Sequence, residues 1–185
     1  MSEPVEAGCV HGRFQPFHNG HLEYALRAKQ LCERLIVGIT NPDPSWIWSE
    51  SDSPHRHLSQ SNPFTYLERA TMIRDSLLDA GVPPRDFILV PFPIQNPDLL
   101  PYYAPRDARH FVRVYSQWEQ EKVRRLRSRG LSLQVLDPGQ EKEVSGEEVR
   151  RLLRTDGQWR SLVPEDTART ICQILANDSQ RLRTP

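Results

Sequence analysis

Short apolar runs alternate with amphipathic segments along most of the chain. The apolar runs, typical of strands buried on both faces, span 5–10, 35–39, 87–90, 111–115 and 131–136. Apolar side chains at helical spacing predict helices over about 19–32, 65–79, 118–129, 145–153 and 164–175. Such an alternation predicts an α/β fold built on a mostly parallel five-stranded sheet.

Two long segments interrupt this alternation. Residues 41–62 have no periodicity, contain several prolines, and carry Trp46, Trp48, His55 and His57. A loop of this length inside a compact domain is usually functional or disordered. The tryptophans fit a lid over a ligand or simple loop anchors equally well, whereas an anion-binding group around Arg56 is favoured over a histidine metal pair. The second interruption is the proline-rich stretch 91–105, and we also expect a frayed tail at about 178–185.

The composition narrows the function classes. With 185 residues, the chain is expected to form a single domain over 1–185. Its 24 acidic and 24 basic residues cancel, so no net field favours nucleic acid or a membrane surface. No apolar run is long enough to span a bilayer, the first residues lack the build of a signal peptide, and three widely spaced cysteines favour free thiols. We therefore expect a cytoplasmic protein. Arg106, Arg109 and Arg113 are interpreted as a solvated face, with Arg106 and Arg109 as less favoured candidates for contact with the acceptor.

The chemistry-bearing segment is G12-R-F-Q-P-F-H-N-G-H21, which follows the first predicted strand. In parallel α/β folds ligands bind beyond the carboxyl ends of the strands, and helix N-termini attract phosphate. His18 and His21 are three residues apart, so both imidazoles can face one polyphosphate and stabilise charge that develops during phosphoryl or nucleotidyl transfer. A lone histidine here is more often a cap, but the pair with Arg13 and two glycines favours a phosphate site. Neither a Walker loop nor a dinucleotide fingerprint is present.

This segment resembles the H-x-G-H motif of the nucleotidyltransferase superfamily with a cytidylyltransferase-like fold. It is most similar to the archaeal-type nicotinamide mononucleotide adenylyltransferases, which carry G-R-F-Q-P-[FY]-H-x-G-H. Further similar blocks follow in the same order: N62-P-F-T-Y-L-E-R69, F87-I-L-V-P91, V114-Y-S116, V144-S-G-E-E-V-R-R-L-L153 and D156-G-Q-W-R-S-L-V-P164. The resemblance covers residues 8 to about 175. It implies a Rossmann-like, doubly wound sheet, mostly parallel and five-stranded, with helices on both faces.

The resemblance also implies a reaction and a set of roles. Members of this family join a nucleoside triphosphate to an acceptor phosphate by direct in-line attack and release pyrophosphate. The catalytic residues implied are His18, His21, Arg13 and Arg150, with the histidines on the α- and β-phosphates and Arg150 on the β/γ end. The nucleotide-binding residues implied are Gly12, Phe14, Gln15, Gly20, Ser145, Gly146, Glu147 and Val149. The acceptor-binding candidates are Asn41, Arg56, Asn62, Phe64, Arg69, Gln95 and Asn96.

Two further expectations accompany these roles. Mg²⁺ would arrive with the nucleoside triphosphate, because the sequence has no evident carboxylate cage to hold it. A homo-oligomer is compatible with the resemblance, since relatives often assemble. Ser145 and Glu148 also form the pattern of a capping box, which the same helix N-terminus can combine with phosphate binding.

The sequence departs from the adenylyltransferase pattern around the acceptor. Ile94 and Pro101 stand where those enzymes carry an Asp and a Trp that help recognise the pyridine ring, and the loop over 41–61 is longer. Glu147 replaces the usual Thr. The residues of the reaction core match the family pattern, whereas those of the acceptor pocket differ from it. This combination predicts transfer of a nucleoside monophosphate from CTP or ATP to a small phosphate or phosphonate acceptor, with a specialised phosphonate or phospho-acid favoured. The alternatives are an adenylyltransferase that makes NAD and a non-catalytic nucleotide-binding regulator, which only Glu147 favours.

Overall fold

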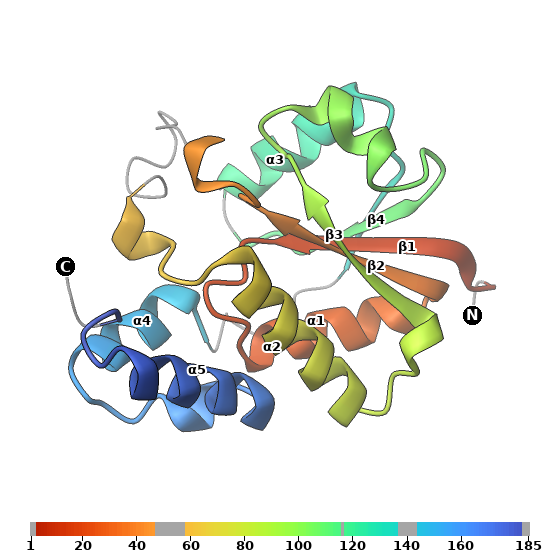
Figure 1. The fold of residues 1–185 in the computed structure, drawn as a ribbon. Helices are drawn as coiled ribbons and strands as arrows, with labels where there is room; N and C mark the ends of the chain where they lie inside the picture. The colour runs from red at the N-terminus through yellow and green to blue at the C-terminus, as the bar shows by residue number, and fades with distance from the viewer. Residues whose placement is uncertain (1–2, 47–57, 116, 137–143, 183–185) are drawn as a thin grey trace.

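The computed structural model describes residues 3–46, 58–115, 117–136 and 144–182. Its strands form one sheet in the order β3-β2-β1-β4-β5, and every adjacent pair is parallel. The strands are β1 (Val5–Gly12), β2 (Cys32–Thr40), β3 (Phe87–Phe92), β4 (Arg109–Val112) and β5 (Leu133–Val135). The predicted α/β fold with a five-stranded parallel sheet is thus confirmed (Figure 1).

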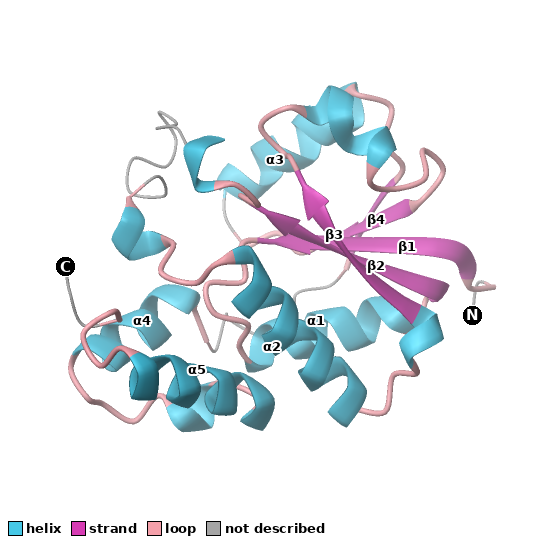
Figure 2. Cartoon of the chain, in the orientation of Figure 1, coloured by secondary structure: helices cyan, strands magenta, loops and turns pink. Residues whose placement is uncertain are grey.

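Helices cover both faces of the sheet (Figure 2). One face carries α1 (Asn19–Lys29), α2 (Tyr66–Asp79), α4 (Gly146–Arg154) and α5 (Glu165–Asn177), and the other carries α3 (Gln117–Ser128) with the 3₁₀ segment Pro97–Tyr102. The period of two along β1 and β2 sorts their side chains between these layers: Val10 and Val37 join the first core, Cys9 and Ile36 the second. Apolar runs without alternation therefore match strands covered on both sides.

The strand order places β1 at the centre of the sheet. The chain moves outward from β1 to β2 and β3, then returns to the other side of β1 to form β4 and β5. The order therefore reverses between β1 and β4, and ligands bind in the crevice at such a switch point. The segment from Gly12 to His21 leaves β1 at this position.

Several element boundaries differ from the predicted ones. The strand predicted over 111–115 instead spans 109–112. The apolar pattern continues past Val112, but the N–H group of Tyr115 donates to the carboxylate of Glu119 in α3, at 2.7 Å, rather than to a strand. The helix predicted to reach residue 32 ends at Lys29, and Cys32 begins β2.

The expectation of a frayed tail at 178–185 is wrong for residues 178–182. Leu182 is buried in the main core, and both terminal nitrogens of Arg181 contact the carboxylate of Glu68, at 2.6 and 2.8 Å. Residues 183–185 lie outside the described residues. A short polar segment has no periodicity, so the sequence gives no sign of this docking.

Two smaller expectations can be compared with the structure. Cys9, Cys32 and Cys172 are all free thiols, as predicted, with Cys9 and Cys32 buried. Of the helices that the structure describes, none combines the length and apolar character needed to cross a bilayer.

Candidate active site

The histidine pair lies at the junction of β1 and α1. His18 is the N-cap residue of α1, with extended backbone, and His21 belongs to the first helical turn. Their rings stack with centroids 3.6 Å apart and planes 20° apart. The backbone N–H of His18 donates to Nδ1 of His21 at 3.4 Å. Because Nδ1 accepts, a neutral His21 carries its proton on Nε2.

Aromatic packing fixes the orientation of these rings. The ring of His21 meets Phe14 edge-on at 4.9 Å and lies nearly parallel to Phe17 at 5.8 Å. Both phenylalanines are buried, and Phe14 has a left-handed backbone with φ of 53°. A Cβ on Gly12 would come within 2.9 Å of the Phe14 ring, so a glycine at the end of β1 lets that ring pack there. The motif therefore supplies both the imidazoles and the rigid surface behind them.

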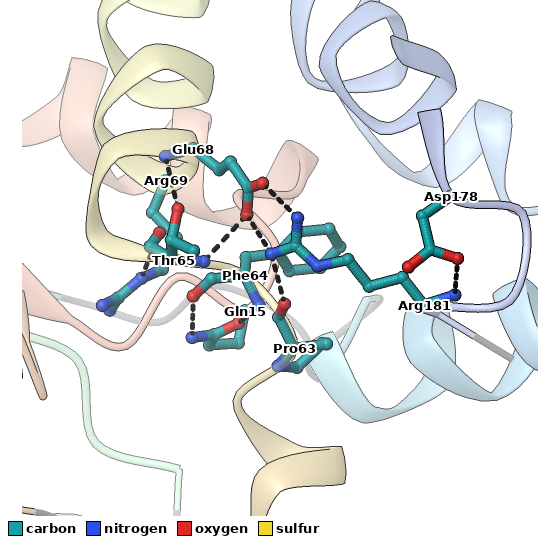
Figure 3. A network of polar contacts seen from close by, with 8 residues as sticks. All are labelled: Gln15, Pro63, Phe64, Thr65, Glu68, Arg69, Asp178 and Arg181. Atoms are coloured by element: carbon teal, nitrogen blue, oxygen red, sulfur yellow. Dashed lines mark hydrogen bonds and ion pairs between the residues drawn. The ribbon is translucent and has the colours of Figure 1, made fainter. Parts of the chain in front are cut away.

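Gln15 joins the histidine segment to the segment before α2. Its side-chain Nε2 donates to the carbonyl of Phe64, and its Oε1 accepts from the N–H of Phe64, both at 2.9 Å (Figure 3). The guanidinium of Arg13 lies 3.5 Å from the carbonyl of Ser61. The donor and the acceptor of the Gln15 side-chain amide are thus both bonded to the main chain of Phe64.

Arg69 is buried among main-chain carbonyls. Its side chain is 2% exposed and donates to the carbonyls of Arg13, Thr40, Asn41 and Thr65, at 2.7 to 3.2 Å. Burial lowers the pKa of this guanidinium to about 10. These bonds place Arg69 between the ends of β1 and β2 and the start of α2. The geometry indicates a residue that holds the loops of the site, while the predicted contact with the acceptor stays a prediction.

The first turns of α4 lie against the histidine segment. Ser145 caps α4, its hydroxyl accepting from the N–H of Glu148 at 3.1 Å. Arg150 is buried and donates to the carbonyl of Gln15 at 2.6 Å. A Cβ on Gly146 would stand 2.9 Å from that same carbonyl oxygen, so only glycine allows this approach without a shift. The structure therefore brings together the two predicted phosphate-binding segments.

The remaining nucleotide-binding candidates, Glu147, Val149 and Gly20, differ in their burial and surroundings. Glu147 is exposed in the first turn of α4, where the helix dipole favours a carboxylate. Val149 is fully buried in the core, so its side chain packs instead of facing solvent. Gly20 lies in the first turn of α1, where a Cβ would make only ordinary contact with the ring of His18.

Two acceptor candidates meet at the ends of neighbouring strands. Asn41, which follows β2 and has φ of 51°, accepts through Oδ1 from Nε2 of Gln95, at 2.8 Å. Gln95 follows β3, so this amide pair lies at the carboxyl ends of β2 and β3, the end of the sheet at which ligands bind.

The other acceptor candidates are dispersed. Asn62 donates to the carbonyl of Leu58, Phe64 is buried in the core, and Asn96 is half-buried before the 3₁₀ segment. Arg56 lies outside the described residues, as do Trp48, His55 and His57, and the structure does not describe the side chain of Trp46.

Sequence reasoning missed several buried polar side chains near the site. His11 stacks on Phe92 with centroids 4.5 Å apart and lies 5.8 Å from the ring of His110. Arg113, interpreted as solvated, has a side chain only 8% exposed and pairs with Glu23 at 2.7 Å. The period of two in β1 could have placed His11 in the second core, opposite Val10, but burial of Arg113 depends on tertiary packing.

The structure offers no dedicated metal cage among the residues it describes, since no three His, Cys, Asp or Glu side chains converge there. The donors of the site are instead imidazole and guanidinium N–H groups and the N-termini of α1 and α4. Such donors bind anionic oxygens directly.

Comparison with known proteins agrees with this arrangement. The family model described as cytidylyltransferase-like matches residues 9–152. Phosphonoformate cytidylyltransferase of Streptomyces viridochromogenes is 45% identical over 164 residues, 89% of each chain. Nicotinamide-nucleotide adenylyltransferase of Saccharolobus solfataricus is 28% identical over 180 residues, 97% of this chain and 96% of that one.

A solved structure shares the fold. The bifunctional NMN adenylyltransferase/ADP ribose pyrophosphatase of Francisella tularensis superposes with a TM-score of 0.71 at 16% identity. The match covers 97% of this chain and 52% of that protein.

Proposed function

This chain belongs to the cytidylyltransferase-like family, and we propose that it transfers CMP from CTP to the phosphonate of a small acceptor, releasing pyrophosphate. The observation that carries the proposal is the 45% identity to a phosphonoformate cytidylyltransferase over 89% of both chains. The stacked histidines and the contact of Arg150 with the carbonyl of Gln15 support the proposal, because they bring donors for phosphate together at the end of β1.

The reaction requires no nucleophile from the protein. A phosphonate oxygen of the acceptor attacks the α-phosphorus of CTP in line, a new P–O bond forms, and the bond to the β-phosphate oxygen breaks with its electron pair. His21, through its Nε2–H, donates to an oxygen that gains negative charge in the transition state. Arg13 and Arg150 hold phosphate oxygens on either side, so catalysis consists of positioning and charge stabilisation.

Mg²⁺ belongs to the same proposal as a companion of the triphosphate. The described residues provide donors for phosphate and no convergent carboxylates, so the phosphates themselves would carry the ion into the site. When bound, it neutralises phosphate charge. We also propose a cytoplasmic location, which free cysteines and a triphosphate substrate support.

Two pairs of residues bear on the identity of the acceptor. The amide pair of Asn41 and Gln95 offers neutral polar groups at the ends of β2 and β3, beside the histidine segment. Ile94 and Pro101 supply none of the polar or indole contacts expected for a pyridine ring. The identity to the adenylyltransferase of Saccharolobus solfataricus is also lower, at 28%, and that to the one of Picrophilus torridus is 32%, so synthesis of NAD fits less well.

A pyrophosphate-release assay tests the proposal directly. CTP, ATP, GTP and UTP are each combined with phosphonoformate, simpler phosphonates and nicotinamide mononucleotide. We expect release with CTP and a phosphonate, and formation of a CMP-phosphonate anhydride seen by ³¹P NMR. Release with no pair would contradict an enzymatic role, and efficient formation of NAD would replace the proposed acceptor.

A further inference from the structure

Arg113 connects the end of β4 to the start of α1. It follows Val112, the last residue of β4, and β4 lies beside β1 in the sheet (Figure 1). Its side chain is only 8% exposed, although arginine usually lies at the surface. The Nη2 atom donates to the carboxylate of Glu23 at 2.7 Å, and Nη1 donates to the carbonyl of Gly20 at 3.4 Å. Both partners belong to the first two turns of α1, so the guanidinium joins that helix to the sheet.

The contact with Gly20 reaches the peptide unit that carries His21. The carbonyl of Gly20 and the backbone nitrogen of His21 belong to one planar unit, which also includes the Cα atom of His21. Arg113 donates to the oxygen of this unit, and the N–H group of the unit donates to the carbonyl of His18 at 2.8 Å. The unit is therefore held from β4 and from the N-cap of α1. Because the imidazole projects from that Cα atom, these two contacts affect its direction.

Tyr24 strengthens the same connection. Its ring packs against the guanidinium of Arg113, with 5.3 Å between the guanidinium carbon and the ring centroid. Its hydroxyl donates to the carbonyl of Phe111 in β4 and accepts from the main chain of His11 in β1. Tyr24 and Arg113 together hold the start of α1 against the two strands that flank the switch point.

Stability alone does not account for the buried guanidinium. The side chain of Glu23 is 55% exposed, so water screens its ion pair with Arg113 and the pair contributes little. The Nε atom of Arg113 is buried, and the described residues provide no hydrogen-bond partner for it. A buried donor without an acceptor lowers the free energy of unfolding. These contacts favour a role in the site over a role in folding.

We propose that Arg113 is a positioning residue for nucleotidyl transfer, which holds the carbonyl of Gly20 and thereby directs the imidazole of His21 toward the phosphates. The inference rests on the proposed function for the reaction that His21 serves. Arg113 acts through another residue and does not contact the reacting atoms. Its effect should appear in kcat more than in KM, because His21 stabilises charge that develops only in the transition state.

Arg113→Met and Arg27→Met provide a matched comparison. Arg27 also pairs with Glu23, at 3.7 Å, but it lies on α1 itself, so only Arg113→Met removes the connection to β4. With CTP and phosphonoformate, we expect Arg113→Met to lower kcat about tenfold and to change the KM of CTP by less than about twofold. Arg27→Met should leave both values unchanged. Arg113→Lys should recover part of kcat, since an ammonium keeps the charge beside Glu23.

A double-mutant cycle with His21→Ala separates positioning from a general structural effect. If Arg113 acts through His21, Arg113→Met should cause no further loss of kcat in the His21→Ala protein. Equal losses in both backgrounds would overturn the proposal. An unchanged kcat in Arg113→Met, or a similar loss in Arg27→Met, would overturn it as well. Melting temperatures identify any variant that does not fold, and Arg113→Lys then takes the place of Arg113→Met in the cycle.

The imidazole can also be observed without turnover. In ¹H–¹⁵N NMR spectra of the protein without substrate, we expect the ring resonances of His21 to shift in Arg113→Met and to stay in place in Arg27→Met. Unchanged resonances in Arg113→Met would contradict the positioning role even if kcat fell. A shift in a protein that transfers no nucleotide would support control of the imidazole by Arg113 while contradicting the proposed function.

Discussion

Two residues beside the candidate site hold left-handed backbone without being glycine. Phe14 has φ of 53° and Asn41 has φ of 51°, and such conformations cost on the order of 1 kcal/mol or more each. The carbonyls that precede them, of Arg13 and Thr40, both accept from the guanidinium of Arg69. A single buried side chain thus stabilises the two turns that carry Arg13, a proposed catalytic residue, and the acceptor candidate Asn41.

Replacement of Arg69 should therefore destabilise the whole protein. In Arg69→Met, buried carbonyls lose their donor, and we expect the free energy of unfolding to fall by roughly 3 kcal/mol or more. Arg69→Lys should fall between wild type and Met, because an ammonium has fewer donors and no planar fork. Urea denaturation measures all of them.

Arg74→Met is the matched control for Arg69, because Arg74 lies on α2 but is exposed and pairs with Asp75. Its change should stay within about 0.5 kcal/mol. Equal losses at both positions would mean that the carbonyl contacts of Arg69 do not contribute to stability.

Replacement of the single residue His21 should lower the reaction rate and leave the stability nearly unchanged. His21→Ala removes the Nε2–H donor, and we expect kcat to fall about 100-fold or more, since one preorganised donor to a developing oxyanion has that effect. The melting temperature should change little because His21 is only half-buried. Asn19→Ala, two residues earlier and exposed, should keep its turnover. Normal turnover in His21→Ala would place the chemistry elsewhere.

At the scale of elements, the N-terminus of α2 joins three parts of the chain. Glu68 completes a capping box with Thr65 and also binds Arg181, while Phe64 just before the helix pairs with Gln15 (Figure 3). The C-terminal segment after α5 is held at this junction by Arg181 and by burial of Leu182. Its docking therefore supports the loop that contacts the histidine segment.

Loss of this segment should be measurable as lost stability. A chain that ends at Asn177 should unfold with roughly 3 kcal/mol less free energy than one that ends at Leu182, mainly through the buried leucine. The ion pair adds little because it is partly exposed. Guanidinium denaturation monitored by circular dichroism compares the two chains. Coincident midpoints would show that the segment only rests on the surface.

At the scale of the whole molecule, buried protons make stability depend on pH. Burial raises the pKa of the Cys32 thiol from its ordinary 9.0 to about 11 and raises that of the Tyr24 hydroxyl well above its ordinary value. Between about pH 9 and 11 the unfolded chain releases these protons while the folded protein keeps them. The unfolded state then binds fewer protons, so the free energy of unfolding falls as pH rises.

Denaturation series at pH 8, 9 and 10 should show this decline, and Cys32→Ala should show a shallower one. The comparison concerns slopes, because the substitution also removes buried volume and lowers stability at every pH. An identical slope in the variant would exclude Cys32 as its source.

Much of the architecture follows from the sequence, and the exceptions share a cause. Apolar runs predict the strands because each is covered on both faces, and the histidine motif predicts its own place after β1. The end of β4 is mispredicted because Val114 and Tyr115 continue the apolar pattern after pairing has stopped. The carbonyl contacts of Arg69 are missed because its partners come from separate segments, and only folding brings them together. The docking of the C-terminal segment is missed for the same reason, since Arg181 and its partner Glu68 are 113 residues apart in the chain.

The contact between Arg150 and Gln15 can form only late in synthesis of the chain. These residues are 135 positions apart, and β4, which pairs with β1, follows β2 and β3 in the chain. During synthesis the histidine segment leaves the ribosome early, and α4 is among the last elements to leave it. A nascent chain therefore contains His18 and His21 long before it contains Arg150. On refolding, ellipticity should accordingly return ahead of pyrophosphate release, because distant pairings form slowly. Recovery of turnover would then report the completion of folding better than ellipticity does.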